Sequence, residues 1–336
     1  LVAYLDRVNV GFAKLQMLDS LKFDDAIYGL GSGIFFIGYL IFEVPSNMIL
    51  RKVGARVWIA RIMITWGIIS ACMLLVKTPM QFYVARFLLG VAEAGFAPGI
   101  MYLLTLWFPA RRRGRAMAIY VMGAPLAFIV GGPVSGWILS SFQNVAPFEA
   151  WQWLFLVEAI PALILGVVVF FFLIDDFQQA PWLNQQEKDQ IEADLRADNA
   201  TKIDHGSVRA FLGNAQLWVF VLIYFCLIMG LYAVGFWMPS LIKRSGVLDP
   251  FWIGIYSAIP NIVAAACLYL SCRSADLTGK RRAHFAAFML LAAVGLALAM
   301  VLNGGPATTI FCLSLAAAGV YSCISLFWAL PTSVFV

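Results

Sequence analysis

Residues 82–99 have the sequence FYVARFLLGVAEAGFAPG, an apolar stretch interrupted by two charged side chains, Arg86 and Glu93. The two lie seven positions apart, about two turns of an α-helix, and therefore share one face with Gly90 between them. A charge inside a bilayer costs at least roughly 2.5–3.5 kcal/mol and usually faces a cavity where it has a function. The stretch predicts a membrane helix with a polar site on one face.

The whole chain has the composition of a membrane protein. Of its 336 residues, 62% are hydrophobic and 12% are charged, whereas a soluble domain has about 45–50% and about 25%. Apolar runs near the roughly 20 residues that cross a bilayer predict an all-α protein with ten spans. These runs lie at 1–21, 25–50, 57–76, 81–107, 115–141, 151–174, 214–242, 251–270, 284–303 and 307–336.

Charge asymmetry between the loops predicts the orientation in the membrane. One set of alternating loops contains 16 of the 23 basic residues, among them Arg51, Lys52, Arg56, Arg111, Arg112, Arg113 and Arg115. Cytoplasmic loops are enriched in Lys and Arg, so we expect this set to face the cytoplasm. Membrane orientation also explains the net charge of +5 better than nucleic acid binding does. We expect a multi-pass protein of a bacterial inner membrane, monomeric and in contact with lipid.

A polar segment, 175–213, divides the chain into an N-terminal transmembrane half, 1–174, and a C-terminal half, 214–336. Residues 181–199 of this linker predict a short amphipathic helix on the cytoplasmic surface. The loop LRKVGAR around Gly54 and the loop ADLTGKRR around Gly279 match when the two glycines are aligned. This match indicates a parallel repeat of the kind found in two-halved transporters.

Four charged residues of the N-terminal half form the candidate site: Asp6 and Arg7 in YLDRVNVGFA, and Arg86 and Glu93. An arginine presents a fixed fork of donors that matches a carboxylate, so Arg7 and Arg86 are suited to bind an organic anion. Asp6 and Glu93 are acids that can take up a proton; sodium is the alternative coupling ion. Structural ion bridges, Asp6 with Arg86 or Arg7 with Glu93, are the competing interpretation.

The remaining polar and small residues predict packing roles. We interpret Glu43 as a gate or helix contact, Glu158 as a helix contact, and Gly131, Gly132 and Gly136 as close packing in 115–141. Neither the six scattered cysteines nor His205 and His284 show the spacing of a metal site. We therefore expect no metal and no cofactor, and a membrane-embedded enzyme has little support.

Four motifs together, LDRVNVGFA, GYLIFEVPSN, FYVARFLLGVAEAGFAPG and FPARRRGRA, resemble the anion:cation symporter branch of the major facilitator superfamily. The sequence of these motifs is most similar to tartrate, phthalate and hydroxyphenylacetate permeases and, more distantly, to the galactonate proton symporter. The resemblance implies two six-helix halves related by a pseudo-two-fold repeat. Of the twelve membrane helices that this implies, the first would then be truncated and the last two, helices 11 and 12 of the family, absent. We therefore expect the chain to be a fragment.

The resemblance also implies roles for individual residues. Asp6 and Glu93 would couple transport to protons, and Tyr4, Arg7, Tyr39 and Arg86 would contact the substrate. In the C-terminal half, Tyr232, Trp237, Asn261 and Trp328 are candidates for the rest of the cavity, and we select Trp328.

The expected function is proton-coupled symport of a small organic anion into the cell by alternating access. The anion would be a carboxylate such as tartrate, a sugar acid or an aromatic acid, a choice that the residues leave open. The alternatives are a sodium-coupled or uncoupled carboxylate carrier and an exporter of the same fold.

Overall fold

The computed structural model describes residues 1–200, 213–302 and 304–327, and in these ranges it contains helices and no strands. The bundle helices are α1 (Val2–Leu21), α2 (Asp25–Val53), α3 (Ala55–Cys72), α4 (Pro79–Glu93), α5 (Phe96–Trp107), α6 (Ala110–Ser141), α7 (Ala150–Phe172), α10 (Ala215–Arg244), α11 (Pro250–Thr278), α12 (Arg281–Val301) and α13 (Pro306–Phe327). The helix α8 (Gln185–Ala200) lies outside the bundle, and two short 3₁₀ turns, Met73–Leu75 and Phe177–Gln179, complete the order. The predicted all-α membrane fold is confirmed.

Nine segments of the described ranges are long and apolar enough to cross a membrane. The tenth predicted span, α1, is more polar because it carries Asp6, Arg7, Lys14 and Asp19. It nevertheless packs against α6, α7 and α10, and its middle is buried. Asp6, Arg7 and Lys14 therefore lie within the helix bundle, whereas Asp19 is exposed.

The predicted span over 81–107 corresponds to one candidate membrane-crossing segment, Pro79–Trp107, but this segment consists of two helices, α4 and α5. Gly95 separates them with a φ of 88°, a left-handed conformation that side chains other than glycine rarely adopt. The hydroxyl of Ser46 donates a hydrogen bond to the freed carbonyl of Ala94 (2.7 Å) and accepts one from the indole of Trp58 (2.9 Å). The break makes Glu93 the last residue of α4.

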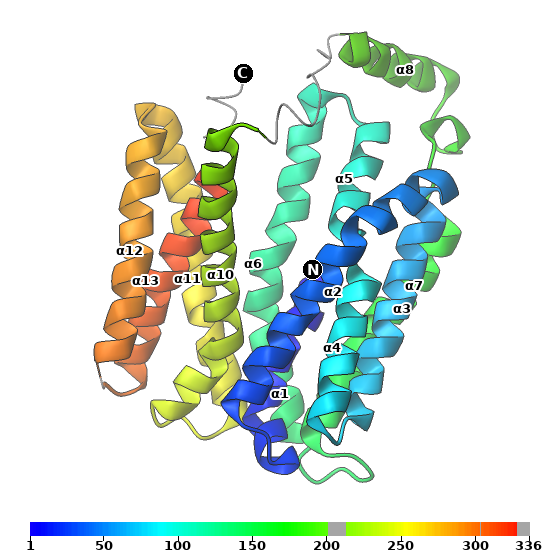
Figure 1. Ribbon diagram of the computed structural model, residues 1–336. Helices are drawn as coiled ribbons and strands as arrows, with labels where there is room; N and C mark the ends of the chain where they lie inside the picture. The colour runs from blue at the N-terminus through cyan, green and yellow to red at the C-terminus, as the bar shows by residue number, and fades with distance from the viewer. Residues whose placement is uncertain (201–212, 303, 328–336) are drawn as a thin grey trace.

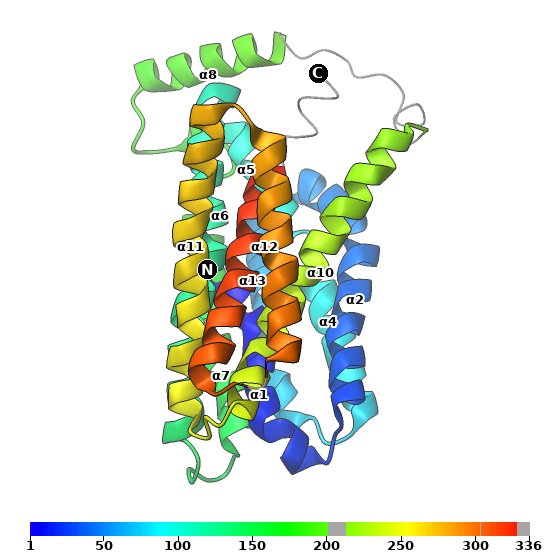
Figure 2. The same ribbon diagram turned by 90° about the vertical axis from the view of Figure 1, so that its left-hand side faces the viewer.

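Helices α1–α7 form one group and α10–α13 another, as Figures 1 and 2 show from two sides. The groups meet where α6 packs along α11 and α1 packs along α10. Glycines permit the first contact: a Cβ on Gly132 would lie 2.7 Å from the carbonyl oxygen of Gly254, and one on Gly254 would lie 2.3 Å from that of Gly132. The predicted glycine cluster therefore serves the contact between the two groups.

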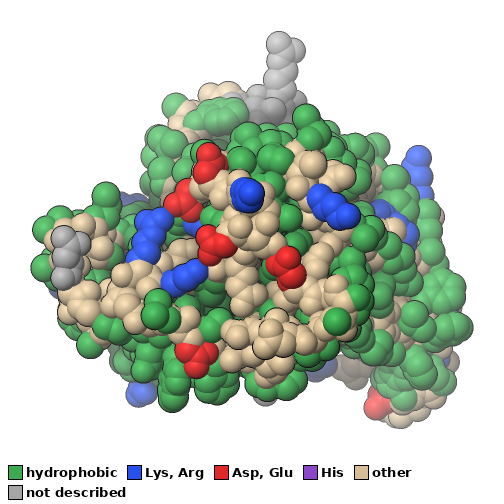
Figure 3. Space-filling model, turned by 90° about the horizontal axis from the view of Figure 1, so that it is seen from below, with side chains coloured by type: hydrophobic (Ala, Val, Ile, Leu, Met, Phe, Trp, Pro, Cys, Tyr) green, Lys and Arg blue, Asp and Glu red, His purple; other side chains and the backbone are tan. Residues whose placement is uncertain are grey.

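The basic loops lie at one end of the bundle. The connections α2–α3, α5–α6 and α11–α12 gather there, and α8 lies across this end (Figures 1 and 2). We call it the inner end, following the predicted orientation, and the opposite end the outer end. Figure 3 shows the outer end, where acidic and basic side chains are mixed on a largely apolar surface.

The two glycines aligned in the repeat have similar roles in the structure. Gly54 ends α2 with a φ of 97°, and Gly279 ends α11 with a φ of 68°. Each amide donates a hydrogen bond to the carbonyl four residues earlier, Leu50 and Ala275 respectively. Both loops therefore stop a long helix at the inner end with a glycine of positive φ.

Candidate functional site

An ion pair between α1 and α4 lies in the interior of the N-terminal group. Both Nε and Nη2 of Arg7 contact Oε2 of Glu93, at 2.7 Å each. The Glu93 side chain is fully buried, and its other oxygen, Oε1, has no hydrogen-bond partner in the part of the chain that the structure describes. One carboxylate oxygen therefore takes up two of the arginine's donors.

Aromatic rings surround the guanidinium of Arg7. Its central carbon lies 5.1 Å from the ring centre of Tyr39, 5.5 Å from that of Tyr4 and 5.6 Å from that of Phe35. From the other helix group, the hydroxyl of Tyr232 on α10 accepts a hydrogen bond from Nη1 (3.1 Å). Arg7 thus contacts α2 and α4 of its own group and α10 of the other group.

The second arginine, Arg86, is only 1% exposed. Its Nε donates a long hydrogen bond to the carbonyl of Gly31 (3.4 Å), and its guanidinium lies 4.9 Å from the centre of the Phe35 ring. Its Nη2 has no hydrogen-bond partner among the described residues. A buried donor without a partner is costly, so Nη2 is available to an acceptor that enters the site.

The second acid, Asp6, is bound by neutral groups. Its Oδ1 accepts hydrogen bonds from the hydroxyl of Ser70 on α3 and, at 3.4 Å, from the amide of Asn9. Of the two ion bridges that the sequence suggested, the structure contains Arg7 with Glu93; Asp6 and Arg86 interact electrostatically without one within the described ranges. The four predicted charged residues therefore lie in one buried region.

Gly90 lies at a contact between α4 and α2. A Cβ at Gly90 would lie 2.0 Å from the carbonyl oxygen of Phe35, and one at Gly38 would lie 2.5 Å from that of Phe87. The close approach that Gly90 permits is therefore that of the α2 backbone. This contact places Phe35 and Tyr39 of α2 beside the two arginines of the site.

The candidates from the C-terminal half have different positions. Tyr232 contacts Arg7, whereas Trp237 lies near the outer end, 3.3 Å from the ammonium group of Lys14 to its ring centre. Asn261 donates to the carbonyl of Ser257 within α11 (2.9 Å). Trp328 lies outside the described residues.

Two aromatic residues of this region were missed. Phe35 lies beside both arginines, and Tyr120 of α6 interacts electrostatically with Tyr4, Tyr39 and Arg7. The position of Phe35, four residues before Tyr39 and hence on the same helix face, is a signal that the sequence offered. Nothing in the sequence around Tyr120 indicated its approach to α1 and α2.

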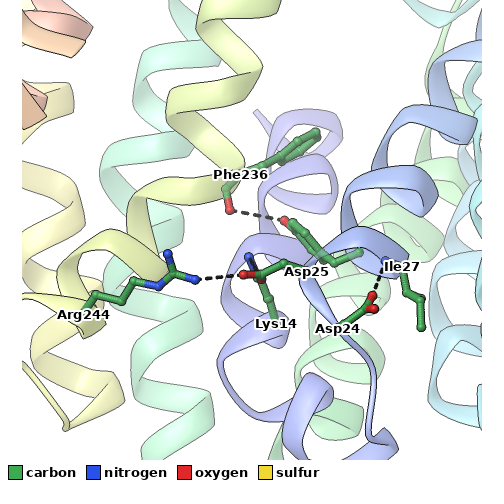
Figure 4. A network of polar contacts seen from close by, with 7 residues as sticks. Lys14, Asp24, Asp25, Ile27, Phe236 and Arg244 are labelled. Carbon is green, nitrogen blue, oxygen red and sulfur yellow. Dashed lines mark hydrogen bonds and ion pairs between the residues drawn. The ribbon is translucent and has the colours of Figure 1, made fainter. Parts of the chain in front are cut away.

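Charged side chains join the two helix groups at the outer end (Figure 4). Asp25, the first residue of α2, pairs with Lys14 of α1 and with Arg244 of α10, at 2.8 Å each. Lys243 adds a hydrogen bond to the carbonyl of Leu15 (2.8 Å). Tyr28 donates one to the carbonyl of Phe236 (3.2 Å), the residue labelled in Figure 4. These contacts hold α1, α2 and α10 together below the buried arginines.

Comparison with known proteins places the chain in a family of transporters. The sequence model described as Major Facilitator Superfamily matches residues 1–335. The chain is 47% identical over 334 residues to a protein of Pseudomonas putida named as a metabolite transport protein, NicT, covering 99% of this chain and 76% of that one. It is 46% identical over 335 residues to a protein of Agrobacterium vitis named as a tartrate transporter, covering 98% and 76%.

The fold has solved counterparts. A crystal structure of a bacterial homologue of the human lysosomal transporter Spinster, in an inward-facing and occupied conformation, superposes with a TM-score of 0.79 at 17% sequence identity. The match covers 99% of this chain and 72% of that one. At this identity the likeness concerns the fold alone.

Proposed function

Since the chain belongs to the major facilitator superfamily, we propose that it carries a small organic anion into the cell together with a proton. Arg7 and Arg86 would bind the anion, and Glu93 and Asp6 would bind the proton. The homologues named as tartrate and metabolite transporters support a small organic anion as the cargo.

The observation that carries this proposal is the difference between the two buried arginines. Arg86 has a buried Nη2 with no protein acceptor within the described ranges, whereas Arg7 donates twice to a single oxygen of Glu93. Charge-assisted hydrogen bonds to a carboxylate are among the strong ones in proteins. A carboxylate substrate would satisfy Arg86 directly, and it would compete with Glu93 for Arg7.

This competition provides a physical basis for coupling. Ionised Glu93 occupies the donors of Arg7, while protonated Glu93 is neutral and holds them weakly. Proton binding would therefore release Arg7 to the substrate, and each ligand would increase the affinity for the other. Moving one monocarboxylate anion with one proton would also leave the net charge of the buried region unchanged.

The neighbouring tyrosines provide the rest of the proposed site. Tyr4, Tyr39 and Tyr232 surround Arg7 with aromatic faces and hydroxyl groups. Such groups suit the hydroxyls of tartrate or a sugar acid as well as the ring of an aromatic acid. Trp328, chosen from the C-terminal candidates, remains a proposed substrate contact.

Transport by proteoliposomes tests the proposal. The full chain would be reconstituted, and uptake of labelled tartrate, hydroxybenzoate and sugar acids would be measured with and without a pH gradient. We expect the gradient to drive accumulation of one of these classes. Accumulation that ignores the pH gradient and follows a sodium gradient would refute proton coupling, and failure of every carboxylate to exchange would refute the anion site.

The role of Glu93 is tested by Glu93→Gln. We expect this variant to exchange labelled for unlabelled substrate and to lose uptake driven by the pH gradient. The matched control is Glu187→Gln on α8, which removes an exposed carboxylate outside the bundle. If Glu93→Gln still accumulates substrate against its gradient, Glu93 is not the coupling acid.

A further inference from the structure

A third acid, Glu158 of α7, lies in the interior of the bundle and has no part in the proposed anion site. Its side chain is 94% buried, since it retains 6% exposure, and its Oε1 accepts a hydrogen bond from Ser135 of α6 (2.6 Å). Its Oε2 has no hydrogen-bond partner among the described residues. An ionised carboxylate with an unpartnered oxygen is expensive in such a place.

The side chains beside Glu158 on α1 also carry oxygens without a hydrogen-bond partner among the described residues, although the amide of Asn9 is itself a donor that reaches the Glu158 carboxyl. Asn9, 1% exposed, adjoins the Glu158 carboxyl and donates its amide to Asp6. Within the described part of the chain, Oδ1 of Asn9 and Oδ2 of Asp6 have no partner either. Three acceptor oxygens of one buried cluster, from Asp6, Asn9 and Glu158, are therefore left without a donor.

One proton would remove most of this imbalance. A protonated carboxyl group has an O–H that donates, so a proton on Oε2 of Glu158 would satisfy that oxygen and supply a donor to Oδ1 of Asn9. The amide of Asn9 already donates to Asp6, which completes a chain of hydrogen bonds from Ser135 through Glu158 and Asn9 to Asp6. A single proton thus satisfies two of the three oxygens.

The balance of buried charge favours the same protonation state. Arg7 and Arg86 are matched by Asp6 and Glu93, and Lys14 is paired with Asp25 at the outer end. An ionised Glu158 would add a negative charge for which the described ranges contain no buried cation. The groups that face it are Asp6 and Asn9 of α1 and Ser135 of α6, with Ser70 of α3 on the far side of Asp6.

We propose that Glu158 is a further proton-binding residue, which shares one proton with Asp6 across Asn9. Asn9 lies one helical turn nearer the outer end of α1 than Asp6, and Glu158 adjoins Asn9, so the added acid lies on the outer side of Asp6. Coupled acids of this kind bind their protons as a pair, in two steps that belong to neither residue alone. The part of Glu158 in transport rests on the proposed proton coupling. The proton that it shares with Asp6 does not depend on that coupling.

Infrared spectroscopy of the reconstituted full chain, titrated from acid to alkaline pH without substrate or gradient, tests the shared proton. We expect the wild type to show a carbonyl-stretch band of a protonated carboxylic acid that persists at neutral pH. Glu158→Gln should remove this component, because the glutamine keeps the acceptor for Ser135 and supplies an N–H to Asn9 without a titratable proton. The control Glu187→Gln should leave the band unchanged.

Coupling is tested by the residual titration. Asp6→Asn should keep the Glu158 component and move its midpoint, because the carboxyl that competes for the proton has gone. A band whose frequency and amplitude are both unchanged in Glu158→Gln, or a midpoint that Asp6→Asn leaves in place, would overturn the proposal. So would a component that appears or disappears when sodium replaces choline at constant pH, since the site would then bind sodium.

Ser135→Ala supplies a second variant if Glu158→Gln fails to fold. It keeps Glu158 and removes the donor to Oε1, so the component should persist and move to higher frequency; an unmoved band would contradict the assignment. In transport, Glu158→Gln should change the shape of the pH profile of substrate exchange, whereas a purely structural residue would lower exchange equally at every pH. Proton coupling could fail in the gradient assay while this titration succeeds, so the two proposals fail separately.

Discussion

The outer-end ion pairs allow a quantitative prediction for Asp25→Asn. Asp25 is the carboxylate shared by Lys14 and Arg244, and the substitution preserves its shape while removing its charge. The two pairs differ in exposure: the Lys14 side chain is 3% exposed and that of Arg244 is 65% exposed. We therefore expect most of the effect to come from Lys14.

The expected magnitude lies between two limits. Exposed ion pairs contribute about 0–1 kcal/mol, and removal of one partner from a fully buried pair costs about 3–5 kcal/mol. Asp25 is 44% exposed, so its pair with Lys14 lies between these cases, and we expect a cost of about 1–2 kcal/mol. The contacts join α1 and α2 to α10, so the cost falls on the state in which the outer end is closed. That state should lose about tenfold in population relative to an outer-open state.

Spin labels at Lys22 and Leu248, both exposed at the outer end, would report the separation of the two helix groups by double electron–electron resonance spectroscopy. Asp25→Asn should shift the distance distribution toward longer values in lipid. The matched control, Arg244→Ala, removes only the exposed pair and should shift it less. An unchanged distribution in Asp25→Asn, or a larger shift in Arg244→Ala, would refute the reasoning.

Two further substitutions test the packing and the anion site. Gly132→Ala places a Cβ about 2.7 Å from the carbonyl oxygen of Gly254, so it should lower the free energy of unfolding by about 1–3 kcal/mol, measured by thermal unfolding. The control Gly33→Ala, whose Cβ would contact nothing within 4 Å, should cost little. Equal melting curves for the two variants would show that α6 and α11 can separate freely. Arg86→Lys keeps the positive charge but loses the planar pair of guanidinium donors, so substrate affinity measured by binding or exchange should fall about tenfold or more. Wild-type affinity in this variant would contradict bidentate binding of the carboxylate at Arg86.

The sequence predicted the helices well because bilayer-spanning runs need little tertiary information. It did not indicate the break between α4 and α5, because the motif AEAG is also compatible with a continuous helix. In the structure, Ser46 donates a hydrogen bond to the freed carbonyl of Ala94 and accepts one from Trp58, and these contacts stabilise the break. The sequence interpretation of Glu158 as a helix contact agrees with the hydrogen bond that it accepts from Ser135 of α6. Only the tertiary structure shows that the second oxygen of Glu158, Oε2, has no hydrogen-bond partner within the described ranges.

For the site, the amino-acid sequence was enough to identify the chemically unusual residues: Asp6, Arg7, Arg86 and Glu93 are charges in apolar helices, and such charges are rare because burial is costly. It also determined the helical class and the division of the basic loops. The tertiary structure alone decided the partners. Arg7 could have paired with either acid, since helical periodicity fixes a residue's face and not which helix it meets. In the folded chain Arg7 meets Glu93 of α4 and Tyr232 of α10, while Nη2 of Arg86 has no hydrogen-bond partner among the residues that the structure describes.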